Sequence, residues 1–232
     1  LEAHESKAWK LYVVCCDELT QTLLTALDLH GVVPIPLSDI ERVFPQLDSC
    51  KHDRDLREYY WTLTPIVVRH ILNTVPEASS CTYLDADTLF FSDPQPVFDE
   101  FRGHSVLIHE HRFQRSMFDD YNPYIFGRFN VGLMSFRRDT RGLKVLDWWQ
   151  ERCLEWCYAR IEKERFGDQK YLDKFPELFE GVCILENIAA GTGPWNHENY
   201  RFDKHPQGCT TIDGEPLIHY HFHGLTICSR DV

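Results

Sequence analysis

The sequence has little positive charge and no long apolar run. It carries 24 Lys and Arg against 36 Asp and Glu, a formal net charge of −12 over 232 residues. This balance excludes a broad basic surface for nucleic acid or anionic membrane, although a small anionic ligand held through a metal ion remains compatible with it. No apolar stretch approaches the roughly 20 residues of a transmembrane segment. The polar start, LEAHESKAWK, lacks the apolar core of a signal peptide, so we expect a cytoplasmic protein.

Repeats, low-complexity tracts and linkers are also lacking, which predicts one domain over residues 1–232. Nine cysteines are present, but the number is odd and the spacing shows no disulfide framework, so we expect reduced, mostly buried thiols. Cys153 and Cys157 lie one helical turn apart, yet no second close pair completes a zinc site. We therefore interpret them, with the neighbouring Trp149, Trp156 and Tyr158, as core residues.

Strand-like and helix-like segments alternate along the chain. Strands are expected at residues 9–16, 32–37, 80–84, 105–110, 130–138 and 181–185, and two more around a hairpin turn at Asp213 and Gly214. Helices are expected at residues 18–30 with Gly31 as the C-terminal cap, 39–44 with Ser38 as the N-cap, 53–73 with a kink at Pro65, and 140–163. This alternation predicts an α/β domain with a mostly parallel central sheet flanked by helices.

Two acidic residues interrupt an apolar stretch at residues 83–91, YLDADTLFF. Burial of an unpaired carboxylate costs several kcal/mol, about 2–7 for polar groups in general and more for charges, so Asp85 and Asp87 should lie at an open strand end or beside a positive group. Ligands of α/β sheets bind beyond the carboxyl ends of the strands, where we expect this pair.

Three interpretations of Asp85 and Asp87 stay open from the residues alone. The pair could cap a turn and a helix start, where Asp is common. It could bind a divalent cation, since carboxylate oxygens are hard ligands. DADTL also fits the opening motif of phosphatases of the haloacid dehalogenase type, with Gly167-Asp168 and Asp173 as a later acidic motif. Some 80 residues of α/β pattern precede it, however, and the stretch before Asp168 is polar.

Histidines form the second informative stretch, IHYHFHG at residues 218–224. On a strand, His219, His221 and His223 share one face. They could be ordinary half-exposed imidazoles or an isolated zinc site of three histidines. We favour a third interpretation, in which one of them joins the two aspartates on a single ion.

Four blocks in order carry a resemblance to a known family: YLDADTLFFSDP (83–94), FNVGLMSFRRD (129–139), FGDQKYLD (166–173) and HFHG (221–224). The arrangement resembles nucleotide-sugar-dependent GT-A glycosyltransferases, in particular retaining enzymes such as glycogenin and the bacterial lipopolysaccharide galactosyltransferases. The resemblance implies a single GT-A (Rossmann-like) domain. It also implies transfer of a sugar, with retention of configuration, from a nucleotide-diphosphate donor such as a UDP-sugar to a hydroxyl of a glycan, lipid or protein.

The same resemblance implies the cofactor and its ligands. Asp85, Asp87 and His221 would bind Mn²⁺ or Mg²⁺, with Asp85 also facing the nucleotide ribose. A divalent ion bridging the two phosphates stabilises the charge that grows on the leaving group.

Further residues receive roles by the same resemblance. Asp168, Gln169 and Asn130 would act at the transferred sugar, with Asp168 on its hydroxyls and Gln169 near the anomeric carbon. Donor binding would involve Asn130, Gly132 and Gly224, together with Asp85, Ala86 and Asp87 of the DxD motif.

The chain departs from the family pattern at both ends. The family opens with a strand and helix that hold the base, whereas only LEAHESKA precedes the strand at 9–16, and a lysine common after the last motif is replaced by LTICSRDV. We therefore expect a domain truncated at both ends, and a noncatalytic nucleotide-sugar-binding domain stands as an alternative beside the phosphatase.

Overall fold

The computed structural model describes residues 9–114, 123–204, 208–224 and 226. Its centre is a four-stranded sheet in the order β3 (Ser80–Leu84), β6 (Phe129–Arg137), β5 (Val106–Glu110) and β7 (Val182–Ile184). β6 runs antiparallel to both of its neighbours, and β5 and β7 are parallel. The expectation of a mostly parallel sheet is therefore wrong: the sheet is mixed. Strands buried on both faces read as the same apolar runs in either direction, so the sequence pattern does not reveal their polarity.

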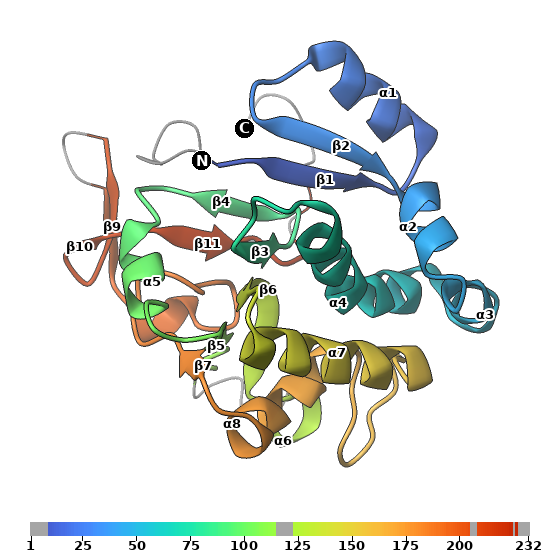
Figure 1. The fold of residues 1–232 in the computed structure, drawn as a ribbon. Helices are drawn as coiled ribbons and strands as arrows, with labels where there is room; N and C mark the ends of the chain where they lie inside the picture. The colour runs from blue at the N-terminus through green and yellow to red at the C-terminus, as the bar shows by residue number, and fades with distance from the viewer. Residues whose placement is uncertain (1–8, 115–122, 205–207, 225, 227–232) are drawn as a thin grey trace.

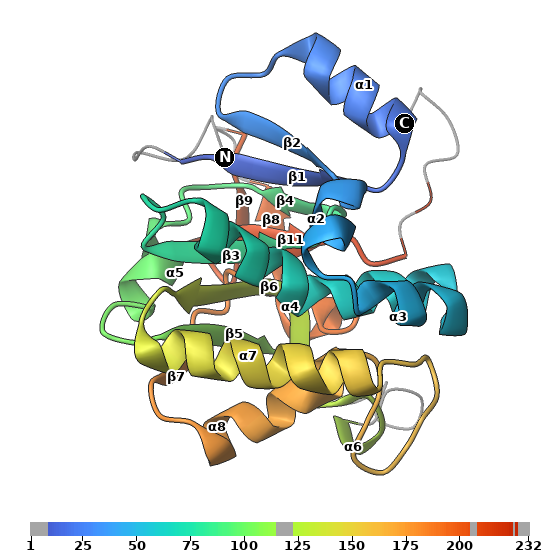
Figure 2. The ribbon, with the colours of Figure 1, turned by 45° about the vertical axis from the view of Figure 1, so that its right-hand side comes forward.

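Helices cover one face of this sheet. α4 (Leu56–Thr74) and α7 (Thr140–Glu155) lie side by side in front of the strands (Figure 2). Val106 and Ile108 of β5 pack with Trp149 of α7 in one core cluster, whereas Leu107 belongs to a second cluster. Successive residues of a strand point to opposite faces, so the sheet separates two hydrophobic cores.

The second core is covered by shorter elements. β4 (Thr88–Phe90) pairs antiparallel with β11 (His219–His221), and this ribbon and α5 (Gln95–Glu100) contribute Phe90, Val97 and Tyr220 to the second cluster. β8 (Phe202–Lys204), β9 (Thr210–Ile212) and β10 (Glu215–Pro216) form a small antiparallel sheet beside it. The predicted hairpin is confirmed, with Asp213 and Gly214 at φ 50° and 91° in its turn.

The N-terminal part forms a separate two-stranded parallel sheet of β1 (Leu11–Cys15) and β2 (Val32–Pro36), linked by α1 (Glu18–Leu27) (Figure 1). α1 has no buried residue. α2 (Leu37–Val43) and α3 (Leu47–Asp53) lead from this sheet to α4 and pack with it in a third apolar cluster that includes Ile40, Leu47 and Leu63.

Several expected helix boundaries are wrong. The helix expected at 53–73 is α4, which begins later, at Leu56, because Asp55 is its N-cap in a reciprocal capping box with Glu58. α4 then continues through the buried Pro65. α2 begins at Leu37, so Ser38 lies inside the helix and is not its cap.

The ends of α1 and α7 also differ from expectation. α1 ends at Leu27, and its C-cap is Asp28 in the left-handed conformation, whereas the expected cap, Gly31, lies three residues further on. α7 ends at Glu155, and its C-cap Trp156 is extended. Trp156 and Cys157 are nevertheless buried, so the apolar pattern continues into a non-helical segment.

Short elements connect the larger ones in the described part of the chain: α6 (Pro123–Phe126), η2 (Gln169–Lys174), α8 (Phe175–Leu178) and η3 (His197–Asn199). Among the described residues, no helix has the length and apolar character that crossing a membrane requires.

Candidate metal and donor site

The pairing of β4 with β11 brings the DxD motif and the histidine-rich strand together. His221 is the register partner of Thr88, and the Phe222 amide donates to the Asp87 carbonyl over 2.8 Å. On the other side, the Asp85 amide donates to the Gly132 carbonyl over 3.2 Å, which ties the motif to β6. Asp87 and His221 are thus neighbours through backbone pairing, although they are far apart in the sequence.

His221 is the basic partner of both aspartates. Its Nε2 lies 2.9 Å from Asp87 Oδ1 and 3.6 Å from Asp85 Oδ2. The imidazole is buried, with 3% of its side chain exposed, whereas Asp87 is 45% exposed. Within the described part of the chain, neither aspartate forms an ion pair with Lys or Arg. The two acidic residues of the apolar stretch therefore lie next to a histidine at the open end of their strand.

A third side chain joins this group. One ligand atom each from Asp87, His221 and His223 lies within 4.8 Å of the other two. Asp87 and His223 are exposed and His221 is buried, so the cluster opens to one side. Asp85, which we expected as a ligand, lies next to this cluster, with its Oδ2 3.6 Å from His221 Nε2.

The Asp85 carboxylate is hydrogen-bonded to Tyr83, whose hydroxyl donates to Asp85 Oδ1 over 2.8 Å. Burial raises the pKa of the Asp85 carboxyl, and the charge of Asp87 raises it further, against the opposing influence of His221 and Tyr83. Burial and the Asp85 charge also raise the pKa of the Tyr83 hydroxyl well above its usual value. The DxD motif therefore contains one inner and one outer carboxylate.

Asp168 lies close to the inner carboxylate. It is buried, with 5% exposure, and its position is fixed by the donation of Trp149 Nε1 to its carbonyl over 2.9 Å. Burial raises the pKa of Asp168 to about 7, and the charge of Asp85 adds to this, although a hydrogen bond with Thr64 opposes it. Asp168 therefore lies on the same side of the site as Asp85.

Asn130 and Gly132 of β6 form the floor beneath His221. Asn130 Oδ1 accepts from the Gly132 amide over 2.8 Å, and its Nδ2 lies 3.2 Å from His111 Nε2. A Cβ at position 132 would lie 2.4 Å from His221 Nδ1, closer than any side chain tolerates. Gly132 is therefore required for the imidazole to lie against β6.

The loop at residues 191–196 forms one wall. Asn196 donates to the carbonyls of His111 and Gly191 over 2.7 and 3.2 Å. Trp195 then contacts the imidazoles of His221 and His223 edge to face, with ring centroids 5.2 and 6.1 Å apart. This loop positions an aromatic side chain against both histidines.

The other predicted residues lie around this centre with less contact. Ala86 is exposed between the two aspartates, and Gly224 is exposed with φ 76° and open space around it. Gln169 begins η2, and its Nε2 donates to the Phe126 carbonyl over 2.7 Å. Its amide nitrogen therefore ties η2 to α6.

The sequence analysis gave Tyr83 and Trp195 no role in the site, and it considered His223 only as part of an isolated zinc site of three histidines. Tyr83 alternates with Asp85, which places both on one face of an extended segment, so this period could have signalled Tyr83. Trp195 reaches the site through a loop, for which no such period exists.

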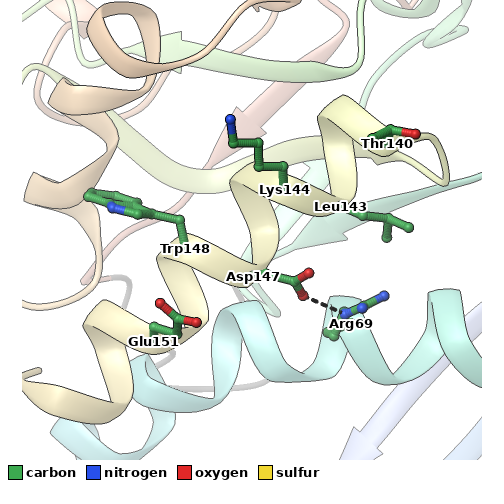
Figure 3. Close-up of a pocket in the computed structure, with 7 residues that line it drawn as sticks. All are labelled: Arg69, Thr140, Leu143, Lys144, Asp147, Trp148 and Glu151. Carbon is green, nitrogen blue, oxygen red and sulfur yellow. Dashed lines mark ion pairs between the residues drawn. The ribbon is translucent and has the colours of Figure 1, made fainter.

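A surface cavity of about 540 Å³ lies elsewhere, over α4 and α7. Figure 3 shows its lining, in which Arg69 Nε pairs with Asp147 over 2.7 Å. It contains no side chain of the four matched blocks; the lining residues are Arg69, Thr140, Leu143, Lys144, Asp147, Trp148 and Glu151. The candidate site is therefore the carboxylate–histidine cluster and not this cavity.

No model of a known protein family matches the chain. Two proteins of Bacillus subtilis (strain 168), both described as uncharacterized, are similar to it. YfnF is 36% identical over 223 residues, which are 94% of this chain and 73% of YfnF. YfnD is 34% identical over 222 residues, which are 95% of this chain and 70% of YfnD.

Among solved structures, the apo form of mouse xyloside xylosyltransferase 1 is similar in fold. The TM-score is 0.52 at 16% sequence identity, and the match covers 95% of this chain and 86% of that chain. At this identity the likeness concerns the fold, which is glycosyltransferase-like.

Proposed function

We propose that this chain, which belongs to the family of the Bacillus subtilis proteins YfnF and YfnD, is a metal-dependent glycosyltransferase. It moves a sugar from a nucleotide-diphosphate donor to an acceptor hydroxyl, with retention of configuration as its motifs imply. The glycosyltransferase-like fold supports the reaction class. The observation that carries the proposal is the meeting of Asp87 with His221, 2.9 Å apart, at the open end of the DxD strand.

The cluster fits a divalent cation. Two ligands about 2.1 Å from an octahedral ion and at right angles lie about 3 Å apart, close to the separation of Asp87 Oδ1 and His221 Nε2. Carboxylate and imidazole are accepted by Mn²⁺, and carboxylate by Mg²⁺. Asp87 and His221 would hold the ion, with Asp85 beside them. When bound, such an ion offsets the negative charge of the departing diphosphate.

The remaining residues act on the sugar side of the site. Cleavage of the donor develops positive charge on the sugar, and Asp168 and the amide of Asn130 supply oxygens that stabilise such charge. Because the pKa of Asp168 is about 7, its carboxyl both accepts hydrogen bonds from sugar hydroxyls and exchanges a proton near neutral pH. Gln169, at the start of η2, lies next to Asp168 in the chain and completes this group in the proposal.

The phosphatase alternative is less compatible with the site. It needs Asp85 as a nucleophile, but Tyr83 donates a hydrogen bond to Asp85 and burial raises the pKa of its carboxyl. The hydrogen bond occupies one carboxylate oxygen, and the raised pKa lowers the fraction of the ionised, nucleophilic form. In addition, Asp173 of the expected acidic motif accepts the Arg128 amide over 2.8 Å.

A donor screen tests the proposal. The purified chain is incubated with Mn²⁺ and with UDP-, GDP- and dTDP-sugars, and release of the nucleoside diphosphate is measured with and without glycan, lipid and protein acceptors. We expect release from one class of donor, with UDP-sugars first, and its loss in Asp87→Asn. An exposed control, His30→Ala, should retain it.

Two results would contradict the proposal. Metal-dependent hydrolysis of p-nitrophenyl phosphate without any donor cleavage would indicate the phosphatase. Tight donor binding without turnover for every acceptor would indicate a noncatalytic binding domain.

A further inference from the structure

We propose that His223 is a direct ligand of the metal ion, so that the two imidazoles of His221 and His223 bind it together with the Asp87 carboxylate. This inference rests on the proposed metal-dependent function and specifies which side chains bind the ion.

The first argument is the position of His223. It is exposed, yet its ligand atom lies within 4.8 Å of those of both Asp87 and His221. The rings of His221 and His223 are 5.8 Å apart and nearly perpendicular, at 86°. In the described part of the chain these three residues form the group with metal-ligand spacing.

The second argument is that Trp195 contacts both imidazoles. It lies 5.2 Å from the His221 ring and 6.1 Å from the His223 ring. Trp195 is itself buried, with 5% exposure, and packs over Gly193, where a Cβ would come within 2.6 Å of the indole. A fixed aromatic wall limits the orientations of both rings, and this favours simultaneous binding of one ion.

Asp85 lies next to these three residues. Its Oδ2 is 3.6 Å from His221 Nε2, and its Oδ1 accepts from Tyr83. Its Oδ2 is therefore close enough to bind the ion or to accept a hydrogen bond from an ion-bound water.

The ligand set has a consequence for metal choice. Imidazole nitrogen suits later divalent metals better than Mg²⁺, and affinity rises from Mn²⁺ towards Co²⁺ and Ni²⁺ at such sites. We therefore expect Co²⁺ and Mn²⁺ to bind more tightly than Mg²⁺.

The test counts imidazole ligands directly. Mn²⁺ alone is added to the purified chain, and pulsed electron paramagnetic resonance measures couplings to ¹⁴N. Two nitrogen ligands are expected in the wild type and one in His223→Ala, whereas the exposed His30→Ala should keep two. Circular dichroism confirms that each variant is folded.

Affinity gives an independent readout. In a Co²⁺ titration followed by visible absorption, His223→Ala should weaken binding at least tenfold, whereas the exposed His30→Ala should leave it unchanged. Competition by Mg²⁺ should be poor in the wild type and stronger in His223→Ala.

The outcomes separate the inference from the proposed function. Metal binding that is lost in His221→Ala but unchanged in His223→Ala, with a single nitrogen coupling throughout, would overturn the inference and leave the metal-dependent function standing. A folded wild type that binds neither Mn²⁺ nor Co²⁺, in the presence or absence of UDP, would overturn both.

Discussion

Gly132 lies directly against the imidazole of His221: a Cβ at position 132 would come within 2.4 Å of Nδ1. The same Cβ would lie 2.9 Å from Asn130 Oδ1, the acceptor of the Gly132 amide. β6 therefore leaves room for the His221 imidazole because Gly132 has no side chain. The position of His221 on β11 is thus limited by a residue of the central sheet.

Gly132→Ala is expected to displace His221. Overpacking of a buried site costs about 1–3 kcal/mol, and misplacing a supporting group lowers metal affinity about 10–100-fold. The free energy of unfolding in urea and the Mn²⁺ dissociation constant measure the two effects. In a His221→Ala background the same substitution should cost less stability, because its nearest neighbour is gone. Equal costs in both backgrounds would contradict the contact.

Asp168→Asn should change how stability depends on pH. The pKa of Asp168 is raised to about 7 in the folded chain, above the ordinary value of 3.8. Between these values the unfolded carboxyl ionises while the folded one keeps its proton. The contribution of Asp168 to stability is therefore fully present below about pH 4. It is lost as the pH rises from there through 7, by roughly 4 kcal/mol in total at 1.36 kcal/mol per pKa unit.

Urea unfolding of the metal-free chain at pH 5 and pH 8 measures this effect. The stability of Asp168→Asn relative to the wild type should be greater at pH 8 than at pH 5, by roughly 3 kcal/mol. A difference between the two proteins that does not vary with pH would contradict a raised pKa.

His219→Leu should reduce the stability that the protein loses as the pH falls. Burial lowers the pKa of His219 to about 3, and that of His111 to about 3 as well. As pH falls below 6.5 the unfolded imidazoles take up protons that the folded ones exclude, so stability is lost. Each such histidine contributes a slope of up to about 1.4 kcal/mol per pH unit. His219→Leu should remove one such share between pH 5.5 and 4, and the exposed His30→Leu should remove none.

Arg54→Met should destabilise the fold without affecting the site. Arg54 is buried and donates to the carbonyls of Cys153 and Leu154, 2.8 and 2.7 Å away, at the C-terminal end of α7. Charged hydrogen bonds and the helix dipole together suggest a loss of about 3 kcal/mol. The exposed Arg102→Met should cost less than about 0.5 kcal/mol. An unchanged midpoint of urea unfolding in Arg54→Met would refute this role.

The local parts of the fold could be predicted from the sequence. The strand at Ser80–Leu84 follows from its residues, and so does the hairpin at Asp213 and Gly214, because neighbouring side chains and turn conformations determine them. The end of α7 could not, because Trp156 and Cys157 continue the apolar pattern while their backbone leaves the helix.

The candidate site, like the fold, could be predicted only in part. Asp85, Asp87 and His221 were predicted as a group, and the pairing of β4 with β11 brings them together. The separate positions of Asp85 and His223 were not predicted, because they depend on the Tyr83 hydroxyl and on Trp195 from a distant loop. Strand polarity was missed for a related reason: a sheet buried on both faces has no one-sided pattern.

The most direct test of the account is calorimetric titration of UDP into the metal-free chain and into the chain with Mn²⁺, for the wild type and for Asp87→Asn. If Asp87 and His221 hold the ion that carries the diphosphate, the wild type binds UDP only with Mn²⁺, and Asp87→Asn, folded by circular dichroism, loses this binding. Equal UDP binding with and without Mn²⁺, or full Mn²⁺-dependent binding by Asp87→Asn, would contradict it.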